Sequence, residues 1–419
     1  MTRLLLVLLV ACRGNSEESE PVTSPAECGT GVAAGSDQRL LRWPYLQRVT
    51  STSAVIAFGA QSDLTTGAVS VGRDTDYTTA TVATTAKELP YEDTAEAPKT
   101  LQLHSAEITG LSPATEYCYK IVAGGAEIVS GLTFKTATDD PDAAVHFLVL
   151  GDFGAGNTAE MDVREAMMEY RETADFLVTV GDNAYSNGTY GQWEANVFDP
   201  YQYLLTRVPF FPTLGNHDYY VEDGEPALEN LFLPENADVV GDVERYWSTD
   251  WGPIHLVGLD SEDPLDRITD DKKGDDERDW LESDLAQNDR PWTIAAYHRP
   301  MRSNTVGRTG DAQVLEYLVP TLEEYEVPLV LQGHDHNYAR FVPMHDGQPL
   351  DANVGGTTYV IAGGGGAGLY DIEVGTDELQ LVGLKSLNFM YGTLEGCTLQ
   401  MQALDDTGAV IDEFTIDRC

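Results

Sequence analysis

The spacing of apolar and polar residues along the chain changes once, near residue 140. Before that point, short alternating runs are separated by turn-forming residues about every ten positions, which is typical of a small antiparallel β-sandwich. Tyr117 stands six residues after Leu111, a spacing that fits the tyrosine corner of such sandwiches. The predicted strands lie at residues 53–60, 67–72, 99–108, 115–122 and 130–136.

After this boundary the apolar runs no longer alternate, as expected of strands that are buried on both faces of a sheet. Residues 157–174 between two of these runs predict a helix that begins with the capping residue Asn157. Residues 311–326 predict a second helix, which Pro320 should kink or split. Alternating strands and helices predict a layered α/β domain, and strands in residues 357–419 should complete its sheets. The apolar runs are residues 145–150, 176–180, 210–214, 254–259, 293–297 and 328–332.

The charge balance narrows the range of partners. The chain of 419 residues carries 69 acidic and 25 basic side chains, a net charge of −44. Ligation of metal ions would use only a few of these carboxylates, so most must coat the surface and keep the protein soluble. A surface of this sign argues against nucleic acid or anionic lipid as a partner.

The N-terminus has the layout of an export signal. Arg3 is followed by an apolar run, residues 4–11, that is too short to span a bilayer. The run ends in a sequence that resembles a bacterial lipobox, which implies that Cys12 carries a lipid and begins the mature protein. Residues 13–38 are rich in Ser, Glu, Gly and Pro and predict a flexible tether. We expect an exported bacterial lipoprotein, periplasmic or on the cell surface, whose lipid is its only membrane attachment; a plain signal peptide and a secreted protein are the alternative.

Four further cysteines predict two disulfides, with three possible pairings. Cys118 points away from the apolar face of its strand, where Cys28 on the incoming tether can reach it. Cys397 and Cys419 lie on the two arms of a predicted hairpin. A two-residue turn at residues 407–408 would place Cys397 opposite Arg418, one position from Cys419.

Five of the six apolar runs end in a polar cluster, four of them beginning with glycine. In open α/β sheets the crevice beyond the carboxyl ends of the strands is where ligands bind, so these clusters should share one site. Four of the eight histidines of the chain fall in this set. The clusters are Asp152; Asp182 with Tyr185; Asn216, His217 and Asp218; His298 with Arg299; and His334, Asp335 and His336.

The residue types point to metal ions. Asp, Asn and His ligands suit divalent Zn, Mn or Fe, and a phenolate oxygen favours Fe(III). The seven candidate ligands are two Asp, one Tyr, one Asn and three His. They are too many for one tetrahedral zinc but suit two ions that share a carboxylate. Two ions about 3.5–4 Å apart can hold the attacking and leaving oxygens of an in-line phosphoryl displacement.

The five motifs, in this order, resemble those of the calcineurin-like metallophosphoesterases. Tyr185 within a GDxxY motif, and the sequence GHDHNYAR at residues 333–340, are similar to those of the purple acid phosphatases. The stretches RWPYLQ (42–47) and GLSPATEYCYKI (110–121) resemble the fibronectin-like N-terminal domain of that family. The resemblance implies an α/β fold class in which a fibronectin type III-like β-sandwich, residues 39–139, precedes a four-layer α/β/β/α domain, residues 140–419.

The resemblance also assigns roles to the residues. The ferric ion would be held by Asp152, Tyr185 and His336, and a divalent partner (Fe, Zn or Mn) by Asn216, His298 and His334. Asp182 would bridge the two ions, and a metal-bound hydroxide would attack phosphorus in line. His217 would stabilise the transition state or protonate the leaving group. Asp218 and Asp335 match no ligand position and should orient neighbouring histidines.

One departure concerns the substrate. Purple acid phosphatases usually carry a further histidine soon after the H-x-P motif, and here Arg299, Arg302 and Arg308 stand in that neighbourhood. Because arginine binds phosphate bidentately, we predict that one of them contacts the substrate. The expected activity is that of an exported acid phosphatase acting on small phosphate monoesters, such as nucleotides or phytate. The alternatives are a phosphodiesterase or nucleotide hydrolase with a Zn or Mn pair, and a catalytically inactive surface binding lipoprotein.

Overall fold

The computed structural model describes residues 28, 38–92, 99–239, 241–262, 273–350, 355–373, 375 and 377–418. The predicted signal with Cys12, the tether apart from Cys28 and residue 38, and Cys419 lie outside the described residues. Within the described ranges, each helix is too short or too polar to cross a bilayer.

The N-terminal part of the chain folds into two four-stranded antiparallel sheets, ordered β1-β2-β6-β5 and β4-β3-β7-β8. Their inner faces meet in an apolar core that includes Phe58, Val69 and Phe134. The tyrosine corner is present, because the Tyr117 hydroxyl accepts a hydrogen bond of 2.9 Å from the backbone amide of Ser112. The strands are β1 (Leu40–Gln47), β2 (Ser53–Gln61), β3 (Gly67–Gly72), β4 (Ala80–Ala83), β5 (Thr85–Glu92), β6 (Lys99–Thr109), β7 (Glu116–Ala123) and β8 (Ala126–Lys135).

A disulfide joins Cys28 to Cys118, which confirms the predicted reach of the incoming segment to the outer face of β7. Cys397 also belongs to a disulfide. Because Cys419 lies outside the described residues, its pairing stays a prediction. The backbone amide of Arg418 donates to the Cys397 carbonyl at 2.9 Å, so these two residues are opposite one another, as the sequence predicts.

The turn of that C-terminal hairpin differs from the prediction. Asp405 and Ala409 pair through a hydrogen bond from the Asp405 amide to the Ala409 carbonyl, so the loop contains three residues instead of two. Gly408 adopts a φ of 77°, which favours glycine and is typical of three-residue hairpin loops. A register shift between Ala403 and Leu404 then restores the pairing that a two-residue turn would have produced.

The remainder of the chain builds two larger sheets that pack face to face. One has the order β11-β10-β9-β21-β22-β23, with β9, β10 and β11 parallel. The other has the order β12-β13-β14-β15-β19-β16-β20, with β13, β14, β15 and β19 parallel. The strands are β9 (Val145–Leu150), β10 (Phe176–Val180), β11 (Phe210–Thr213), β12 (Trp247–Trp251), β13 (Ile254–Gly258), β14 (Trp292–Ala296), β15 (Leu329–Gln332), β16 (Tyr338–Phe341), β19 (Thr358–Ala362), β20 (Gln380–Leu384), β21 (Phe389–Glu395), β22 (Thr398–Leu404) and β23 (Val410–Asp417), beside a small pair, β17 (Met344–His345) and β18 (Gln348–Pro349).

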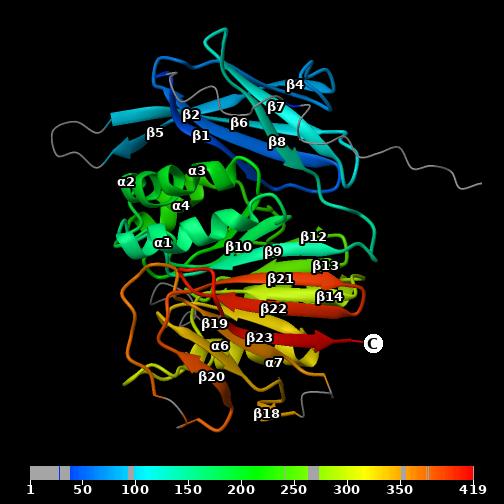
Figure 1. The fold of residues 1–419 in the computed structure, drawn as a ribbon, viewed down its shortest axis with the longest axis vertical. Coiled ribbons are helices and arrows are strands. Elements are labelled where there is room, and N and C mark those ends of the chain that lie inside the picture. The colour runs from blue at the N-terminus through cyan, green and yellow to red at the C-terminus, as the bar shows by residue number, and fades with distance from the viewer. Residues whose placement is uncertain are drawn as a thin grey trace, which may run out of the picture.

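The apolar runs are buried on both faces, as predicted. In β13, Leu256 belongs to the core between the two sheets, whereas its neighbour Val257 belongs to a second core shared with α5, α6 and α7. Ile294 and Ala295 in β14 divide in the same way. Figure 1 shows α1 to α4 on the opposite face of the sheet that contains β9 and β10, between this sheet and the N-terminal strands. The predicted α/β/β/α layers behind a β-sandwich are therefore confirmed.

The two predicted helices are present. The side chain of Asn157 accepts from the Glu160 amide and caps α1. The second segment is split into α6 and α7, and Pro320 stands in the first turn of α7. The helical elements are α1 (Thr158–Met167), η2 (Met168–Tyr170), α2 (Tyr190–Trp193), η3 (Glu194–Phe198), α3 (Asp199–Leu205), η4 (Glu222–Gly224), α4 (Glu225–Asn230), α5 (Lys273–Gln287), α6 (Ala312–Tyr317) and α7 (Val319–Glu324).

The RWPYLQ stretch in β1 binds the sandwich to the larger part of the protein. Arg42 is buried and pairs with Glu194 at 2.7 Å. The Tyr45 hydroxyl donates to the backbone carbonyl of Asn230 at 2.6 Å, and the side-chain amide of Gln47 donates to the backbone carbonyl of Phe210 at 2.5 Å. Because Phe210 begins β11, this contact lies on a strand whose far end carries Asn216 and His217.

Candidate metal centre

All five polar clusters lie just beyond the carboxyl ends of β9, β10, β11, β14 and β15. Three of their residues have left-handed backbone conformations that are rare outside glycine: Asp152 (φ 53°), Asp182 (φ 52°) and His334 (φ 68°). Such strain persists only where the surrounding structure imposes it, and it clusters at functional sites. The loops also lie very close together, because a Cβ on Gly215 would lie 2.2 Å from the Asp182 amide nitrogen.

The first group of donors gathers around the Tyr185 hydroxyl. Its oxygen lies 3.2 Å from Asp152 Oδ1, 3.1 Å from His336 Nε2 and 2.9 Å from Asp182 Oδ2. His336 Nε2 is also 3.4 Å from Asp152 Oδ1. Asp152, Asp182 and His336 are close enough together to ligate a single ion.

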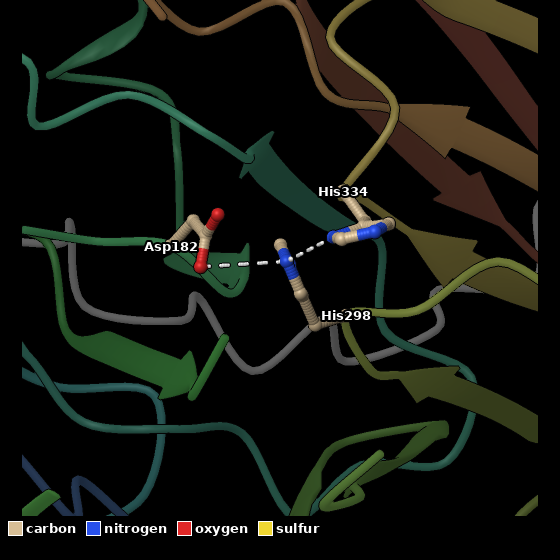
Figure 2. Close-up of side chains that lie close together, drawn as sticks. All are labelled: Asp182, His298 and His334. Carbon is tan, nitrogen blue, oxygen red and sulfur yellow. Dashed lines mark hydrogen bonds and ion pairs between the residues drawn. The ribbon is translucent and has the colours of Figure 1, made fainter. Parts of the chain in front are cut away.

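The second group gathers around His298 Nε2, which lies 3.4 Å from Asp182 Oδ1 and 3.2 Å from His334 Nδ1 (Figure 2). The same nitrogen is 3.3 Å from Asn216 Oδ1. Asp182 turns one carboxylate oxygen to each group, which is the position of a bridging ligand. The structure thus brings together all seven residues predicted as metal ligands.

The hydrogen bonds of the histidines show that this donor set fits cations. His298 Nδ1 lies 2.8 Å from the Val180 carbonyl, and His336 Nδ1 lies 2.9 Å from the Gly368 carbonyl, so each Nδ1 carries the proton that it donates. In the neutral rings both Nε2 lone pairs therefore point inward, where Asp152, Asp182 and Asn216 present acceptor oxygens and only the Tyr185 hydroxyl has a proton to donate. Facing lone pairs repel one another unless a positive charge lies between them.

The electrostatics of the two adjacent rings show that a proton on His298 can also supply this positive charge. Burial lowers the pKa of His298, but the carboxylates of Asp182, Asp152 and Glu262 together outweigh it and raise the pKa to about 10. Burial and the nearby His298 charge lower the pKa of His334 to about 2. The buried carboxylates Asp152 and Asp182 therefore stabilise a positive charge in the site. A proton would reside on His298 and not on His334.

His217 lies at the rim of this site. Its backbone amide donates to Asp182 Oδ1 at 2.8 Å, and its Nδ1 lies 2.6 Å from the Ser186 carbonyl. Its ring packs 4.5 Å from that of Tyr185, and its Nε2 lies 3.9 Å from Asp182 Oδ2. With Nδ1 bound to a carbonyl, Nε2 is left to face the site.

The two other aspartates act differently from the prediction. Asp218 accepts hydrogen bonds from the backbone amides of Gly215, Asn183 and Ala184, at 2.9 to 3.1 Å, and so ties two ligand-bearing loops together. Asp335 accepts from Ser303 Oγ and from Arg308 at 3.2 Å. Backbone carbonyls, and not these carboxylates, hold the Nδ1 atoms of His217, His298 and His336.

Each of the three arginines predicted to bind substrate is paired with a carboxylate. Arg299 forms a two-point ion pair with buried Glu262, with contacts of 2.7 and 2.8 Å. Arg302 pairs with Asp377 at 3.2 Å. Arg308 contacts the His334 carbonyl as well as Asp335, both at 3.2 Å. The structure therefore ties all three to the protein itself, and Arg308 is the one that contacts the GHDH segment.

Sequence reasoning missed Tyr370, which stacks on His336 with ring centroids 4.1 Å apart and an interplanar angle of 11°. The Arg308 guanidinium lies over the Tyr370 ring, 4.4 Å from its centre. Tyr370 follows the glycine-rich stretch 362–368, whose backbone lies against the ligand loops. A Cβ on Gly363 would be 2.3 Å from the Asp335 carbonyl oxygen, so this position admits no side chain.

Fold and donor set together are those of the two-metal phosphoesterase class. The calcineurin-like phosphoesterase family matches residues 145–338, and the purple acid phosphatase N-terminal domain matches residues 44–136. By these two matches the chain is similar to the calcineurin-like metallophosphoesterases and, within them, to the purple acid phosphatases.

Individual relatives agree in fold and differ in described activity. "Probable inactive purple acid phosphatase 1" of Arabidopsis thaliana is 25% identical over 371 residues, which are 75% of this chain and 58% of the relative. "Purple acid phosphatase 21" of the same plant is 25% identical over 277 residues, 63% of this chain and 58% of the relative. The solved structure of a yellow lupin seed purple acid phosphatase has a TM-score of 0.76 at 21% identity, covering 90% of this chain and 74% of that one. The chain thus spans less than two thirds of these curated relatives.

Proposed function

We propose that this protein is an exported metal-dependent phosphatase that hydrolyses small phosphate monoesters. The observation that carries the proposal is the meeting of seven donor side chains from five strand ends, with two imidazole lone pairs turned inward at oxygen atoms. Because some relatives are named as inactive, the completeness of this donor set is the main argument for activity.

Asp152, Tyr185 and His336 would hold one ion, preferably Fe(III) because of the phenolate, and Asp182 would be shared. Asn216, His298 and His334 would hold a divalent Fe, Zn or Mn ion. Such an ion pair supplies an activated water and neutralises the charge of the phosphate. The left-handed backbones of Asp152, Asp182 and His334 fix these donors before substrate arrives.

His217 is the residue placed to move a proton. Its Nδ1–H is engaged by the Ser186 carbonyl, so Nε2 can donate a proton to the leaving oxygen only when the ring carries both protons. In the neutral ring the same nitrogen can accept a hydrogen bond from the substrate side. Contacts with the rings of Tyr185, tilted, and Tyr220, edge-on, hold the ring in this orientation.

We also propose that the protein is anchored as a lipoprotein through Cys12 and divides near residue 139 into the sandwich and the metal-bearing domain. The lipobox-like sequence supports the first point, and the disulfide between Cys28 and Cys118 fits an oxidising compartment. Metabolic labelling with a fatty acid, compared with Cys12→Ser, tests the anchor.

The activity is tested with a chromogenic phosphate monoester and the metal-loaded protein, with and without a chelator. We expect turnover that the chelator abolishes, and no more than background turnover for Asp182→Asn. Absence of turnover at every pH, in protein shown to contain two metal equivalents, would overturn the proposal. A visible absorption band that is lost in Tyr185→Phe would identify the ferric ion.

A further inference from the structure

Tyr220 is an exposed aromatic residue beside the metal centre that the motif comparison did not single out. It is 59% exposed, and its ring packs edge-on against that of His217 with centroids 4.9 Å apart. Its hydroxyl accepts a hydrogen bond of 3.0 Å from the side-chain nitrogen of Asn216. This contact links a surface side chain directly to one of the seven donors.

The contact bears on which end of the Asn216 amide faces the site. An amide can coordinate a cation only through its oxygen, and Asn216 Oδ1 lies 3.3 Å from His298 Nε2. His298 Nδ1–H donates to the Val180 carbonyl, so in the neutral ring, the form that ligates a metal, Nε2 presents a lone pair to that oxygen. Two acceptors facing one another is an arrangement that suits a bound cation and is unfavourable without one.

The opposite orientation would let the Asn216 amide nitrogen donate to His298 Nε2 and would turn the oxygen away. Tyr220 engages that nitrogen on the far side and so keeps it out of the site. The ring of Tyr220 is in turn held by its contact with His217, which fixes the position of the hydroxyl.

We propose that Tyr220 is a positioning residue for the ion held by Asn216, His298 and His334: its hydroxyl holds the Asn216 amide with the oxygen directed at the metal. This inference rests on the proposed two-metal centre. It concerns one ion of the pair only, because Asn216 is assigned to that ion and not to the one held by Asp152, Tyr185 and His336.

The test is Tyr220→Phe, which removes only the hydroxyl of an exposed side chain. Metal content is measured by mass spectrometry after dialysis against increasing chelator concentrations. We expect one of the two metal equivalents to be released at a chelator concentration about tenfold lower than in the wild type, while the other is retained as before. Tenfold is the lower end of the usual range for such supporting residues, because water can reach an exposed amide and replace part of the contact.

Two variants serve as references. Tyr203→Phe removes the hydroxyl of another exposed tyrosine, 40% exposed and packed edge-on against Trp43, and should release both equivalents as the wild type does. Tyr185→Phe alters the other ion site and should weaken the other equivalent instead.

The outcomes separate the two proposals. A wild-type protein that never holds two equivalents would overturn the metal centre itself. A wild type with two equivalents and an unchanged release curve for Tyr220→Phe would overturn only the role of Tyr220. Equal weakening of both equivalents, or a lowered melting temperature of the metal-free variant, would mean a general structural role and would also overturn it.

Discussion

Two buried groups of histidine and aspartate lie at opposite ends of the same sheet, and they differ in what the imidazole nitrogens face. His255 near the start of β13 has both nitrogens 2.8 Å from carboxylates, Nδ1 from Asp250 and Nε2 from Asp284. His298 follows the end of the neighbouring strand β14, with Nδ1 on a carbonyl and Nε2 at 3.2 to 3.4 Å from three other side chains.

This difference indicates which of the two groups is suited to bind a cation. The His255 group is complete, because each ring nitrogen can donate a proton to an acceptor at hydrogen-bond distance. Burial lowers its pKa, but the two aspartates outweigh this and raise the pKa to about 9, so the ring itself supplies the positive charge. At His298 the carboxylates also raise the pKa, but Nε2 faces three side chains at 3.2 to 3.4 Å, all of them predicted ligands, and a cation among them would contact all four groups at once.

The strongest test of this contrast is Asp182→Asn, which keeps the shape of the bridging side chain and removes its charge. Loss of the shared ligand should weaken both ions and lower kcat/KM for a phosphate monoester by at least about 100-fold. The measurement is steady-state turnover with metal content determined on the same sample. Asp250→Asn, the matched change at the His255 group, should leave turnover within twofold of the wild type. Comparable losses of activity in both variants would contradict the contrast.

His217→Gln probes the rim of the metal centre. Glutamine can still occupy the position but cannot deliver a proton, so kcat should fall about 100-fold or more while both metal equivalents are retained. Turnover of a substrate with a very good leaving group should fall less, because that oxygen needs little protonation. Equal losses for good and poor leaving groups would mean that His217 acts by charge alone. His146→Gln, in β9 at a partly buried ring stacked on Tyr391, is the control that should change neither value.

His255→Gln probes the closed group, where the expected effect is on stability. The folded pKa of His255, about 9, lies above its ordinary value of 6.5, so its contribution is complete below pH 6.5 and is lost as the pH rises to about 9. The shift would correspond to more than about 3 kcal/mol, which we reduce to about 2 kcal/mol because Asp250 is 43% exposed.

Denaturant unfolding of the wild type and of His255→Gln at several pH values measures this difference. We expect a gap of about 2 kcal/mol at pH 6 that closes by pH 9 to 10. His345→Gln, at a side chain that is 40% exposed, should show no such gap. A gap that is independent of pH would show that His255 acts through packing and not through its charge.

The donors at the strand ends could be predicted because each follows an apolar run directly, and a strand carries its last residues to a fixed edge. Tyr370 could not, because its place beside His336 depends on how the glycine-rich loop folds back onto the ligand loops. The pairing of Arg299 with Glu262 was hidden for a similar reason, since the two residues lie on different loops brought together only by the sheet.

The strand β5 could not be predicted from the sequence for a different reason. In β5 (Thr85–Glu92) the first four residues are exposed, and Leu89 alone is fully buried, so no alternation of apolar residues marks the strand. Its place in the sheet comes from pairing with β6, in which Leu103 lies opposite Lys87. An edge strand that contributes backbone hydrogen bonds and few buried side chains leaves little trace in the sequence.

The smallest expected effect concerns the field of the whole molecule at the metal centre. The net charge is −44, and the three arginines near the site are already paired with Glu262, Asp377 and Asp335. An anionic phosphate ester therefore approaches a negative surface on which those arginines add little local attraction. Salt shortens the range of this repulsion to about 10 Å at 0.1 M. We expect KM to fall about two- to threefold between low and moderate ionic strength with kcat unchanged. A KM that stays constant or rises over that range would show that the metal ions, and not the acidic surface, dominate the approach of the substrate.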